Sequence, residues 1–570
     1  MNNDELLKQV RQVDIHQVGF HPIIRAYMQR LGLVDLINGL VGSQMEVEPG
    51  LIVAGMIQDT LSGRSPLYHL EDFFADHDTE LLLGEPVEPS AFSDHNVGRV
   101  LDRIQGTGAS RIFNEVARRA AVVFDLDTNS GHWDSTSVSV WGDYNSRPDQ
   151  EGTRLNLTYG YSKDHRPDLK QFMLGMLCVE HNIPILGETH DGNSSDKTLN
   201  NKLLTRINKD LAQHGLGEGA FTYTADSAMV TEENLACFDP IPGAAPFYFV
   251  TRLPFAYNET DRVVAEAVRA NQWQEIGVLA SSRPTPKRPC ASYRACDTTV
   301  ELYGKSFRAI VIHSSAHDKR RQKRIDKELA LARQNLTDTL SLSLKTAFFC
   351  LADAEAELKR LLSLPMPCHN LVTRIEEEII YAKGRPPKEG PRRVAARRWR
   401  IHAEIVERPE VIDRKRAEAG CFVLLSNRPI QGPDAQTPEE LLRTYKAQDG
   451  IERNFSFLKD PLIVNDLFLK KPERIEALGM ILLLCLLIWN LMQRQMRQHL
   501  EKTNATIEGL DRRKTTRPTS YMMTTKFSNI LILKVDQSRM LKKPLSPTQQ
   551  AYIKALGLTE EIFTSMHPPP

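Results

Sequence analysis

Four polar residues between positions 445 and 459 are spaced as one side of a helix. Tyr445, Gln448, Glu452 and Lys459 lie at offsets of three, seven and fourteen from the first. At about 100° per residue, all four fall within about 60° of one another. A stripe with a phenol, an amide, a carboxylate and an ammonium is a candidate site. The alternative is an ordinary amphipathic helix, because its apolar residues can form a separate core face: Leu441, Leu442, Ile451, Phe455 and Leu458.

The sequence also predicts both ends of the helix that carries this stripe. Thr437 is a good N-cap, Pro438 suits the first helical position, and Glu440 completes a capping box with Thr437. Pro461 ends the run, because proline does not continue a helix. We therefore predict one helix over residues 437–460.

The chemistry that such residues support depends on carboxylates elsewhere in the chain. Phosphoryl transfer on DNA uses two divalent metal ions about 3.5–4 Å apart, held by carboxylates. Asp134 lies inside a β-prone run, where a charged residue needs a reason. Asp226 directly follows a predicted strand, a position where sites form in α/β sheets, and its alternative is a helix N-cap. Glu452 is the third candidate, and four competitors look more like turn or cap residues: Asp127, Asp143, Asp191 and Asp196.

The elements that must position these acids divide the chain into five parts. Residues 1–120 are periodic and helical, and are predicted to form a domain that binds DNA or dimerises, or a helical domain without a site. Residues 121–254 read as a mixed α/β sheet with helices. Residues 255–415 form an inserted α+β region, helical over 316–383. Residues 416–500 return to strand and helix, and residues 501–570 are a polar, basic tail, partly disordered in isolation.

Periodicity assigns the individual elements within these parts. The helical runs begin at His21-Pro22, Pro49, Ser90, Ser110 and Ser195. The alternating, β-prone runs predict strands over 131–140, 156–161, 172–179, 184–188, 221–225, 247–253, 307–312 and 420–429.

Composition narrows the class of protein. The chain has 570 residues and zero formal net charge, yet basic residues gather at 319–324, 383–400 and 512–514. Such runs can bind a polyanion locally. Eight cysteines form no CxxC pair, which favours reduced, mostly buried thiols over a zinc site. The N-terminus has no apolar signal core, and the longest apolar run, 480–489, is about half a membrane span. We therefore predict a cytoplasmic protein with no membrane partner.

Several stretches together resemble a bacterial insertion-sequence transposase of the DDE type, in the IS4-related group and the IS1634-like family. Tyr445-x2-Gln448-x3-Glu452-x6-Lys459 resembles that group's Y-R-E-K signature. The run GYSKDHRPDLKQ at 160–171 resembles the block after the first catalytic strand, and GNSSD at 192–196 resembles the following turn. The helical region at His21-Pro22 and the helix at 474–490 resemble the family's N-terminal domain and C-terminal core helix.

The resemblance implies a ribonuclease-H-like mixed sheet, with the inserted region before the Glu-bearing helix. It implies that Asp134, Asp226 and Glu452 bind two Mg²⁺ ions, with Mn²⁺ as a substitute. The implied activity is cut-and-paste movement by phosphodiester hydrolysis and strand transfer. The implied partners are double-stranded DNA, as terminal inverted repeats and target, and a second copy of the chain in a homodimer on DNA.

DNA contacts are expected in three places. The resemblance implies backbone contacts by Tyr445 and Lys459, whereas Gln448 replaces the signature's arginine and supplies no charge. In the block after the first strand, Lys163 and Arg166 lie close to Asp134 in sequence, and could equally belong to a turn network with Asp164 and Asp168. The basic run at 383–400 is either a DNA-backbone contact or a solvated helical face, and its candidate residues are Arg392, Arg393, Arg397 and Arg398.

Two other functions use the same residues. A metal-dependent nuclease on this fold would cut DNA without joining it, and needs the same three acids. A catalytically inactive DNA-binding relic predicts an eroded acid set or a broken helix, and the sequence has neither.

Overall fold

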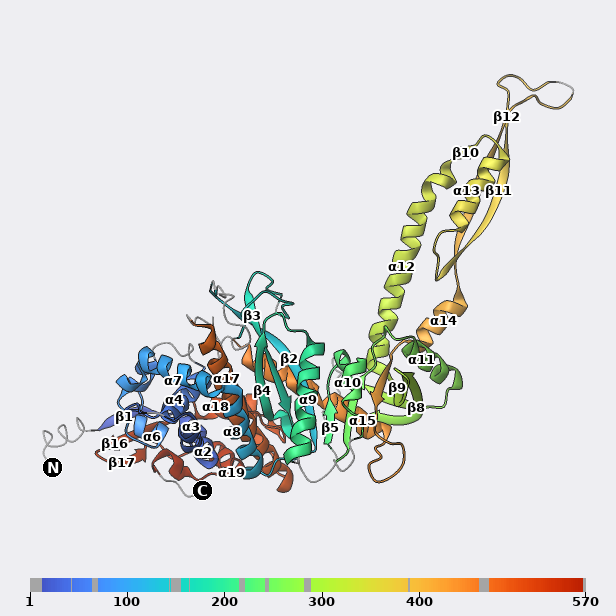
Figure 1. Ribbon diagram of the computed structural model, residues 1–570. Helices are drawn as coiled ribbons and strands as arrows, with labels where there is room; N and C mark the ends of the chain where they lie inside the picture. The colour runs from blue at the N-terminus through green and yellow to red at the C-terminus, as the bar shows by residue number, and fades with distance from the viewer. Residues whose placement is uncertain are drawn as a thin grey trace. The chain divides into compact units, whose positions relative to one another are not determined.

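The structure is a computed structural model that describes residues 13–42, 44–63, 70–142, 144, 155–163, 165–214, 221–240, 245–280, 289–387, 390–460 and 471–566. The chain forms two compact units (Figure 1). The first unit joins Met1–Thr251 to Thr444–Pro570, and the second is Arg252–Arg443.

The first unit begins with the predicted helical region. Its helices are α2 (His21–Leu31), α3 (Leu33–Val41), α4 (Pro49–Leu61), α5 (Leu70–Ala75), α6 (Thr79–Leu83), α7 (Asp94–Thr107) and α8 (Ala109–Val123). Proline at the first turn of α2 and of α4 suits a position where the missing N–H leaves no bond unmade. All thirteen residues of α4 are buried, so this helix is the centre of the helical core.

The long helix α17 (Pro472–Lys502) completes this core, and packs on α4, α7 and α8. Among the described residues it alone is long and apolar enough to span a membrane by length and composition. However, 89% of its most apolar window is buried inside the protein. The predicted buried core helix at 480–489 is therefore confirmed.

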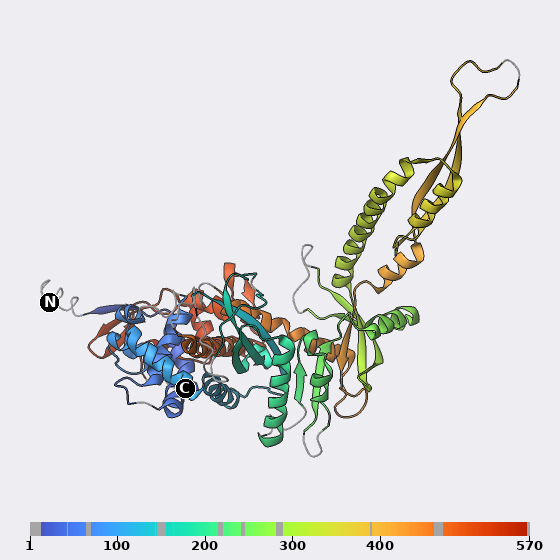
Figure 2. The ribbon, with the colours of Figure 1, turned by 45° about the horizontal axis from the view of Figure 1, so that its top comes forward.

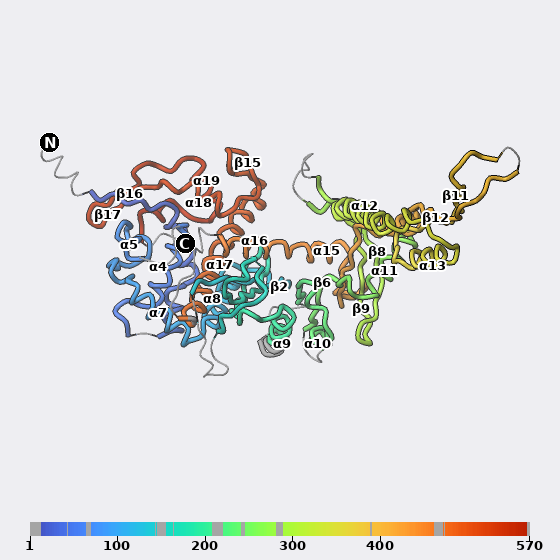
Figure 3. The backbone as a smooth tube through the Cα atoms, turned by 90° about the horizontal axis from the view of Figure 1, so that it is seen from above, coloured from blue at the N-terminus to red at the C-terminus, as the bar shows by residue number. Residues whose placement is uncertain are grey.

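Residues 501–566 fold, in contrast to the partly disordered tail that their composition predicts. They form α18 (Ser520–Phe527), α19 (Pro547–Ala555) and the strands β14 (Ile507–Glu508), β15 (Lys514–Thr515), β16 (Leu531–Val535) and β17 (Ser538–Leu541). β16 pairs antiparallel with β1 (Asp14–Gln17) near the other end of the chain (Figure 3). We call α2–α8, α17–α19 and the β1-β16-β17 sheet the helical body.

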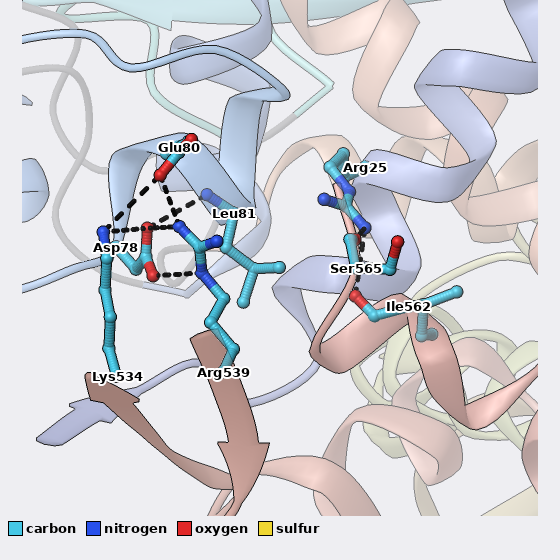
Figure 4. Close-up of polar contacts among 8 residues, drawn as sticks. All are labelled: Arg25, Asp78, Glu80, Leu81, Lys534, Arg539, Ile562 and Ser565. Carbon is cyan, nitrogen blue, oxygen red and sulfur yellow. Dashed lines mark hydrogen bonds and ion pairs between the residues drawn. The ribbon is translucent and has the colours of Figure 1, made fainter. Parts of the chain in front are cut away.

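Buried polar contacts hold the two ends of the chain together in the helical body (Figure 4). Arg539 donates from Nε to Asp78 Oδ2 at 2.7 Å and from Nη2 to Glu80 Oε2 at 2.6 Å. Arg25 Nη2 donates to the carbonyl oxygens of Ile562 and Ser565, each at 3.0 Å. The polar tail is ordered because these contacts and its apolar residues attach it to the N-terminal helices. Its polar composition did not reveal this apolar packing.

The sheet of the first unit has the strand order β4-β3-β2-β5-β6. Its strands are β2 (Ser130–Val140), β3 (Lys170–Cys178), β4 (Pro184–Asp191), β5 (Phe221–Thr224) and β6 (Phe247–Arg252). β2, β3 and β4 pair antiparallel, whereas β2, β5 and β6 are parallel neighbours. The predicted mixed α/β sheet is thus confirmed, but the strand predicted over 156–161 is reduced to one bridge between Thr158 and Gln171.

The second unit contains an antiparallel sheet of order β13-β9-β8-β7. These strands are β7 (Gln274–Val278), β8 (Ser292–Leu302), β9 (Lys305–Ser314) and β13 (Cys421–Ser426), accompanied by the helices α11 (Asn258–Ala270) and α14 (Pro409–Glu418). The strands predicted at 307–312 and 420–429 are confirmed within these bounds.

The same unit carries an extended substructure over Ser315–Glu407, which we call the arm (Figure 2). It consists of α12 (Ser315–Lys345), β10 (Ala347–Phe348), α13 (Leu351–Leu362), β11 (His369–Tyr381) and β12 (Val394–Glu407). The prediction that the helical region continues to residue 383 is wrong, because the chain forms the strand β11 from His369. Leu371 and Ile375 alternate there with polar residues and pack in a core with Leu340, Leu361 and Ile401, which favours a strand.

The helix predicted over 437–460 forms as two helices, α15 (Pro438–Ala447) and α16 (Asp449–Leu458). The capping box is confirmed, since Glu440 accepts from the Thr437 N–H at 2.7 Å and Thr437 Oγ1 accepts from the Glu440 N–H at 3.2 Å. At the junction, Gln448 donates its N–H to the carbonyl of Tyr445, three residues back. This tighter turn interrupts the α-helical bonding in the middle of the predicted helix.

All eight cysteines are free, as predicted. The expectation that most are buried holds for half of them: Cys178, Cys368, Cys421 and Cys485. The other four are half-buried or exposed.

Candidate active site

Asp134 and Asp226 occupy corresponding positions on neighbouring parallel strands. The register of β2 and β5 places His132 opposite Thr224. Two residues further along the chain in each case, Asp134 lies within β2 and Asp226 lies two residues beyond the end of β5. The two carboxylates therefore lie at the carboxyl end of β5, where sites form in α/β sheets.

The alternative role expected for Asp226, a helix N-cap, is also present. Its Oδ1 accepts the Ala228 N–H at 3.1 Å at the start of the short helix η3 (Ser227–Met229). The backbone carbonyl of Asp226 accepts a bond from Thr251 Oγ1 at 2.8 Å, which ties the strand end to β6. Capping engages only Oδ1, and within the described part of the chain Oδ2 accepts no hydrogen bond, so the two roles are compatible.

Burial raises the pKa of both aspartates. The pKa of Asp134 rises to about 6, because desolvation outweighs the nearby charge of Lys163, and the charges of Asp226 and Asp196 add to the rise. The pKa of Asp226 is raised by burial and, to a smaller extent, by Asp196. Three carboxylates thus act on one another in a partly desolvated place, an arrangement in which a bound cation would be favourable.

Asp196 is the member of this group that the sequence treats as a mere cap. It is the first residue of α9 (Asp196–His214) and accepts a hydrogen bond from Ser135 Oγ, next to Asp134 on β2. Its place in the GNSSD motif was a signal for a site. Because a helix was predicted directly after it, Asp196 could also be explained as the N-cap of that helix.

Lys163 is a cation close to two of these carboxylates. Its Nζ lies 3.8 Å from Asp134 Oδ1 and 3.7 Å from Asp196 Oδ2, and it donates to the Ser135 carbonyl oxygen at 2.6 Å. The lysine therefore faces the carboxylates, and its predicted DNA contact stays a prediction.

The two motif blocks at 160–171 and 192–196 pack against each other beside the site. Gln171 Nε2 donates to the carbonyl oxygens of Gly192 at 2.7 Å and Tyr161 at 3.3 Å. A Cβ atom on Gly192 would lie 2.0 Å from the Gln171 carbonyl oxygen, so no larger residue fits this approach. The packing fixes the segments that carry Lys163 and Asp196.

α16 packs on the face of the sheet that carries Asp134. Asn454 Nδ2 contacts Cys178 Sγ at 3.4 Å and Met176 Sδ at 3.9 Å on β3. Met176 lies opposite Asp134 in the antiparallel register, and paired residues on neighbouring strands project to the same face. Glu452, two residues before Asn454, lies on a different side of α16 and is exposed.

The described residues contain no group of three or more His, Cys, Asp or Glu side chains arranged to hold a metal ion. The structure thus brings Asp134 and Asp226 together and places Glu452 on a helix over the same sheet, with its side chain in solvent. The donor chemistry fits magnesium, which prefers carboxylate oxygens. The predicted three-acid site stays a prediction.

The remaining stripe residues and Arg166 have local environments. Tyr445, Gln448 and Lys459 are half-buried. Arg166 pairs with Asp168 at 2.7 Å and stacks over the Trp141 ring at 5.0 Å, as the turn-network alternative expects. Asp164, the other member of that network, lies outside the described residues.

The arginines predicted to contact DNA from the basic run lie beside or on β12, a strand rather than a helical face. Arg397 pairs with Glu377 at 3.0 Å, Arg398 lies over the Phe349 ring at 3.4 Å, and Arg392 lies over the Tyr381 ring at 5.1 Å. Arg393 is exposed. Three of the four arginines thus have partners within the arm, and the DNA contacts expected of all four stay predictions.

Comparisons with known proteins cover parts of this arrangement. A family model described as a domain of unknown function (DUF4277) matches residues 13–118, the segment from β1 to α8. Among curated proteins, none matches the chain. Among solved structures, a piggyBac transposase synaptic complex with hairpin DNA is similar at 9% identity and a TM-score of 0.36, over 82% of this chain and 74% of that one. A similarity this low carries no argument about function.

Proposed function

We propose that this protein is a DDE-type transposase of an insertion sequence, in the IS1634-like family of the IS4-related group. The observation that carries the proposal is the nearness of Asp134, within β2, to Asp226, just beyond the end of the parallel strand β5, on a sheet face covered by the helix that bears Glu452. The sequence blocks at 160–171 and 192–196 also support the proposal, because both lie beside these two aspartates.

In the proposed site, Asp134, Asp226 and Glu452 would hold two Mg²⁺ ions, or Mn²⁺ in their place. When bound, the metals would activate the attacking oxygen and stabilise the leaving oxygen of a phosphodiester. Lys163 orients Asp134 and Asp196 from the adjoining loop. The substrate is double-stranded DNA, first at the element's terminal repeats and then at a target, with a homodimer on the DNA.

The proposal is tested with the DNA that flanks the coding region. Short inverted repeats are sought there, and a pre-cleaved duplex ending in one of them is incubated with the full chain, a supercoiled target and Mg²⁺. Wild-type protein should join the end to the target. Asp134→Asn, Asp226→Asn and Glu452→Gln should each lower joining by at least about a thousandfold, the scale set by losing an essential group in a catalytic site.

Glu439→Gln is the matched control, since this half-buried glutamate pairs with Arg443 on the same helix, α15, at 2.8 Å. It should join DNA at the wild-type rate. Cutting without joining would replace the proposal by the nuclease alternative. Full activity in Glu452→Gln would remove that residue from the site, and absence of DNA binding by the wild type would overturn the proposal as a whole.

The departure at Gln448 gives a second test. If this position contacts a phosphate at the transposon end, Gln448→Arg adds one charge-assisted contact. The slope of log affinity against log salt should then steepen by about 0.9. An unchanged slope would show that residue 448 does not contact the DNA backbone.

A further inference from the structure

The helix α16 docks on η2 (Glu180–Asn182), the turn that connects β3 to β4. Asn182 has a left-handed backbone there, with φ at 63°, a conformation that asparagine adopts more readily than most residues. Its carbonyl oxygen accepts two side-chain hydrogen bonds, from Asn454 Nδ2 on α16 at 2.8 Å and from Asn490 Nδ2 on α17 at 2.9 Å. One backbone group thus joins the sheet to both helices.

The two asparagines also bind each other, which closes a small polar network inside the first unit. Asn490 Nδ2 donates to Asn454 Oδ1 at 3.1 Å, and the two residues are 5% and 4% exposed. Apolar packing is non-directional, whereas a hydrogen bond weakens steeply when its angle changes. The network therefore fixes the rotation of α16 about its own axis more closely than the apolar side chains of this helix do.

Gly450 forms a second contact between α16 and the same turn. A Cβ atom at this position would lie 1.9 Å from Asn182 Oδ1, so the helix approaches the turn this closely only with glycine. Gly450 and Asn454 are four residues apart and are therefore neighbours on one side of the helix. Asn182 thus contacts that side at two points, with its side chain at Gly450 and its carbonyl oxygen at Asn454.

Glu452 lies two residues from each of these contacts. At about 100° per residue, it projects about 160° away from both, on the side of α16 opposite the turn. Rotation of the helix by about 20° would move a carboxylate that lies about 5–6 Å from the helix axis by about 2 Å. Magnesium holds oxygen ligands at about 2.0–2.1 Å in nearly ideal geometry, so such a shift would separate the carboxylate from a bound ion.

The contacts that place α16 all lie within the first unit. This unit resumes at Thr444, and the tight turn at Gln448 separates α16 from α15. Besides the polar network, α16 contacts α17 through the rings of Phe457 and Trp489, whose centroids are 5.2 Å apart. Because that contact is apolar, the directional contacts of α16 are those with Asn182 and Asn490.

We propose that Asn182 and Asn454 are positioning residues for the proposed active site. They hold α16 in the rotation that brings the Glu452 carboxylate to the metal ions bound by Asp134 and Asp226. Each acts through Glu452 and contacts neither the metal nor the DNA. The inference rests on the proposed function, in which the three acids bind the metal, and adds to it the contacts that place the third acid.

Asn454→Leu tests the inference in the full chain. Leucine is similar in size, and the Asn182 carbonyl oxygen keeps its bond from Asn490, so the variant should unfold within about 4 °C of the wild type. Binding of Mn²⁺ to the chain on a pre-cleaved duplex, without target DNA, is measured by electron paramagnetic resonance. The variant should bind Mn²⁺ about tenfold more weakly. Its rate of joining in Mg²⁺ should fall about a hundredfold, as for a misplaced catalytic group.

Gln58→Leu is the control for a general loss of stability. Gln58 is buried on α4 of the helical body, where its Nε2 donates to the carbonyl oxygens of His21 and Leu82, each at 3.2 Å. Loss of these bonds should lower the unfolding temperature at least as much as Asn454→Leu does. The Mn²⁺ affinity and the rate of joining at room temperature should nevertheless match those of the wild type.

Combining Asn454→Leu with Glu452→Gln shows whether the asparagine acts through the glutamate. If it does, the double variant joins DNA as slowly as Glu452→Gln alone, because the position of the missing carboxylate no longer matters. A further large loss in the double variant would show that Asn454 acts elsewhere, and would overturn the inference.

The contact at Gly450 gives a rescue experiment. Gly450→Ala should push α16 away from the turn and weaken both Mn²⁺ binding and joining. Asn182→Gly removes the side-chain atoms that the new Cβ would meet, suits the left-handed backbone and keeps the carbonyl oxygen. Gly450→Ala/Asn182→Gly should therefore recover most of the affinity and the rate, and failure to recover them would overturn the role of Asn182.

The inference and the proposed function fail in different ways. Wild-type Mn²⁺ affinity and joining in Asn454→Leu would overturn the inference, while joining by the wild type upholds the proposed function. A wild type that neither binds Mn²⁺ nor joins DNA would instead overturn the proposed function.

Discussion

Asp78 in the helical body and Glu377 on the arm both pair with an arginine, but in different surroundings. The side chains of Asp78 and Arg539 are 0% and 2% exposed, whereas those of Glu377 and Arg397 are 36% and 59% exposed. The first pair lies in a low-dielectric interior, where losing one partner leaves an uncompensated charge. The second is screened by water, so the same kind of contact contributes little to stability.

Apolar side chains differ between the two regions in the same way. Every residue of α4 in the helical body is buried, but on the arm Leu342 and Phe349 are 77% and 76% exposed. The arm has only a narrow core around Leu340, Leu361 and Ile401. The helical body is therefore expected to resist change and the arm to tolerate it, which the following substitutions test.

Arg539→Met should have the largest effect, about 3–5 kcal/mol lost from the free energy of unfolding, because buried Asp78 loses its bidentate partner and keeps only the longer ion-pair contact with Lys534 at 3.4 Å. Burial alone would raise the pKa of Asp78, but hydrogen bonds from Arg539 lower this pKa below its ordinary value. The stability from Asp78 is therefore present above its unfolded pKa and lost as pH falls below about 4. Urea unfolding measures both effects. Lys534→Met, at the partly exposed side of the same network, is the smaller-effect control, and a loss below 1 kcal/mol for Arg539→Met would contradict the account.

His21 should make the helical body sensitive to acid. Burial lowers its pKa to about 4 from an ordinary 6.5, and its Nδ1 lies 2.8 Å from Gln58 Oε1. The neutral ring is favoured in the folded state, so stability is full above pH 6.5 and declines toward pH 4, by up to about 3 kcal/mol.

His21→Gln should remove this part of the pH dependence, seen as a smaller difference between unfolding free energies at pH 7.5 and 4.5. The value at pH 7.5 serves as each variant's own reference. His132 and His190, whose pKa values burial also lowers to about 4, should retain their share. An unchanged difference would show that His21 can be protonated without loss of packing.

Gly50→Ala should cost about 1–3 kcal/mol, because a Cβ there would lie 2.4 Å from the Val34 carbonyl oxygen and 2.9 Å from Val34 Cα, atoms of the backbone. Gly106→Ala on α7 is the control, since its Cβ would have no neighbour within 4 Å. That change should stabilise α7 by about 0.5–1 kcal/mol. Thermal unfolding distinguishes the two, and equal effects would mean that α3 and α4 can move apart freely.

Arg397→Gln on the arm should have the smallest effect, below about 1 kcal/mol, since its pair with Glu377 is exposed. Arg400→Gln, which loses the similar pair with Glu378, should behave alike. The same urea titration measures both variants. A loss above 2 kcal/mol would erase the contrast with the helical body.

Local pattern predicted much of the fold and the strand positions of two residues of the candidate site. The alternation around Asp134 indicated β2, and the end of a β-prone run placed Asp226 after β5. Their adjacency depends on the parallel pairing of β2 and β5, which are separated in sequence by β3, β4 and α9. Spacing alone does not predict such long-range register.

The failures have identifiable causes. Glu376, Glu377 and Glu378 favour a helix by propensity, but packing of Ile375 against Ile401 made this segment a strand. Asp196 looked like a cap because it begins α9, and the hydrogen bond that brings it to the site comes from Ser135, sixty-one positions away. The sequence predicted a helix around Glu452, and Glu452 does lie on a helix. The tight turn at Gln448, which divides the predicted helix into two, could not be recognised from the sequence.

The pairing of β1 with β16 can form only late in the synthesis of the chain. Residues 14–17 emerge from the ribosome early, yet their partners at 531–534 follow more than five hundred residues later. At about 5–20 residues per second, the interval is roughly half a minute to two minutes. Over that time the N-terminal helices lack Arg539 and the carbonyls of Ile562 and Ser565. A chain that lacks β16 and β17 would therefore leave Asp78 without Lys534 and Arg539 as ion-pair partners, so the N-terminal helices gain these stabilising contacts only after both strands are made.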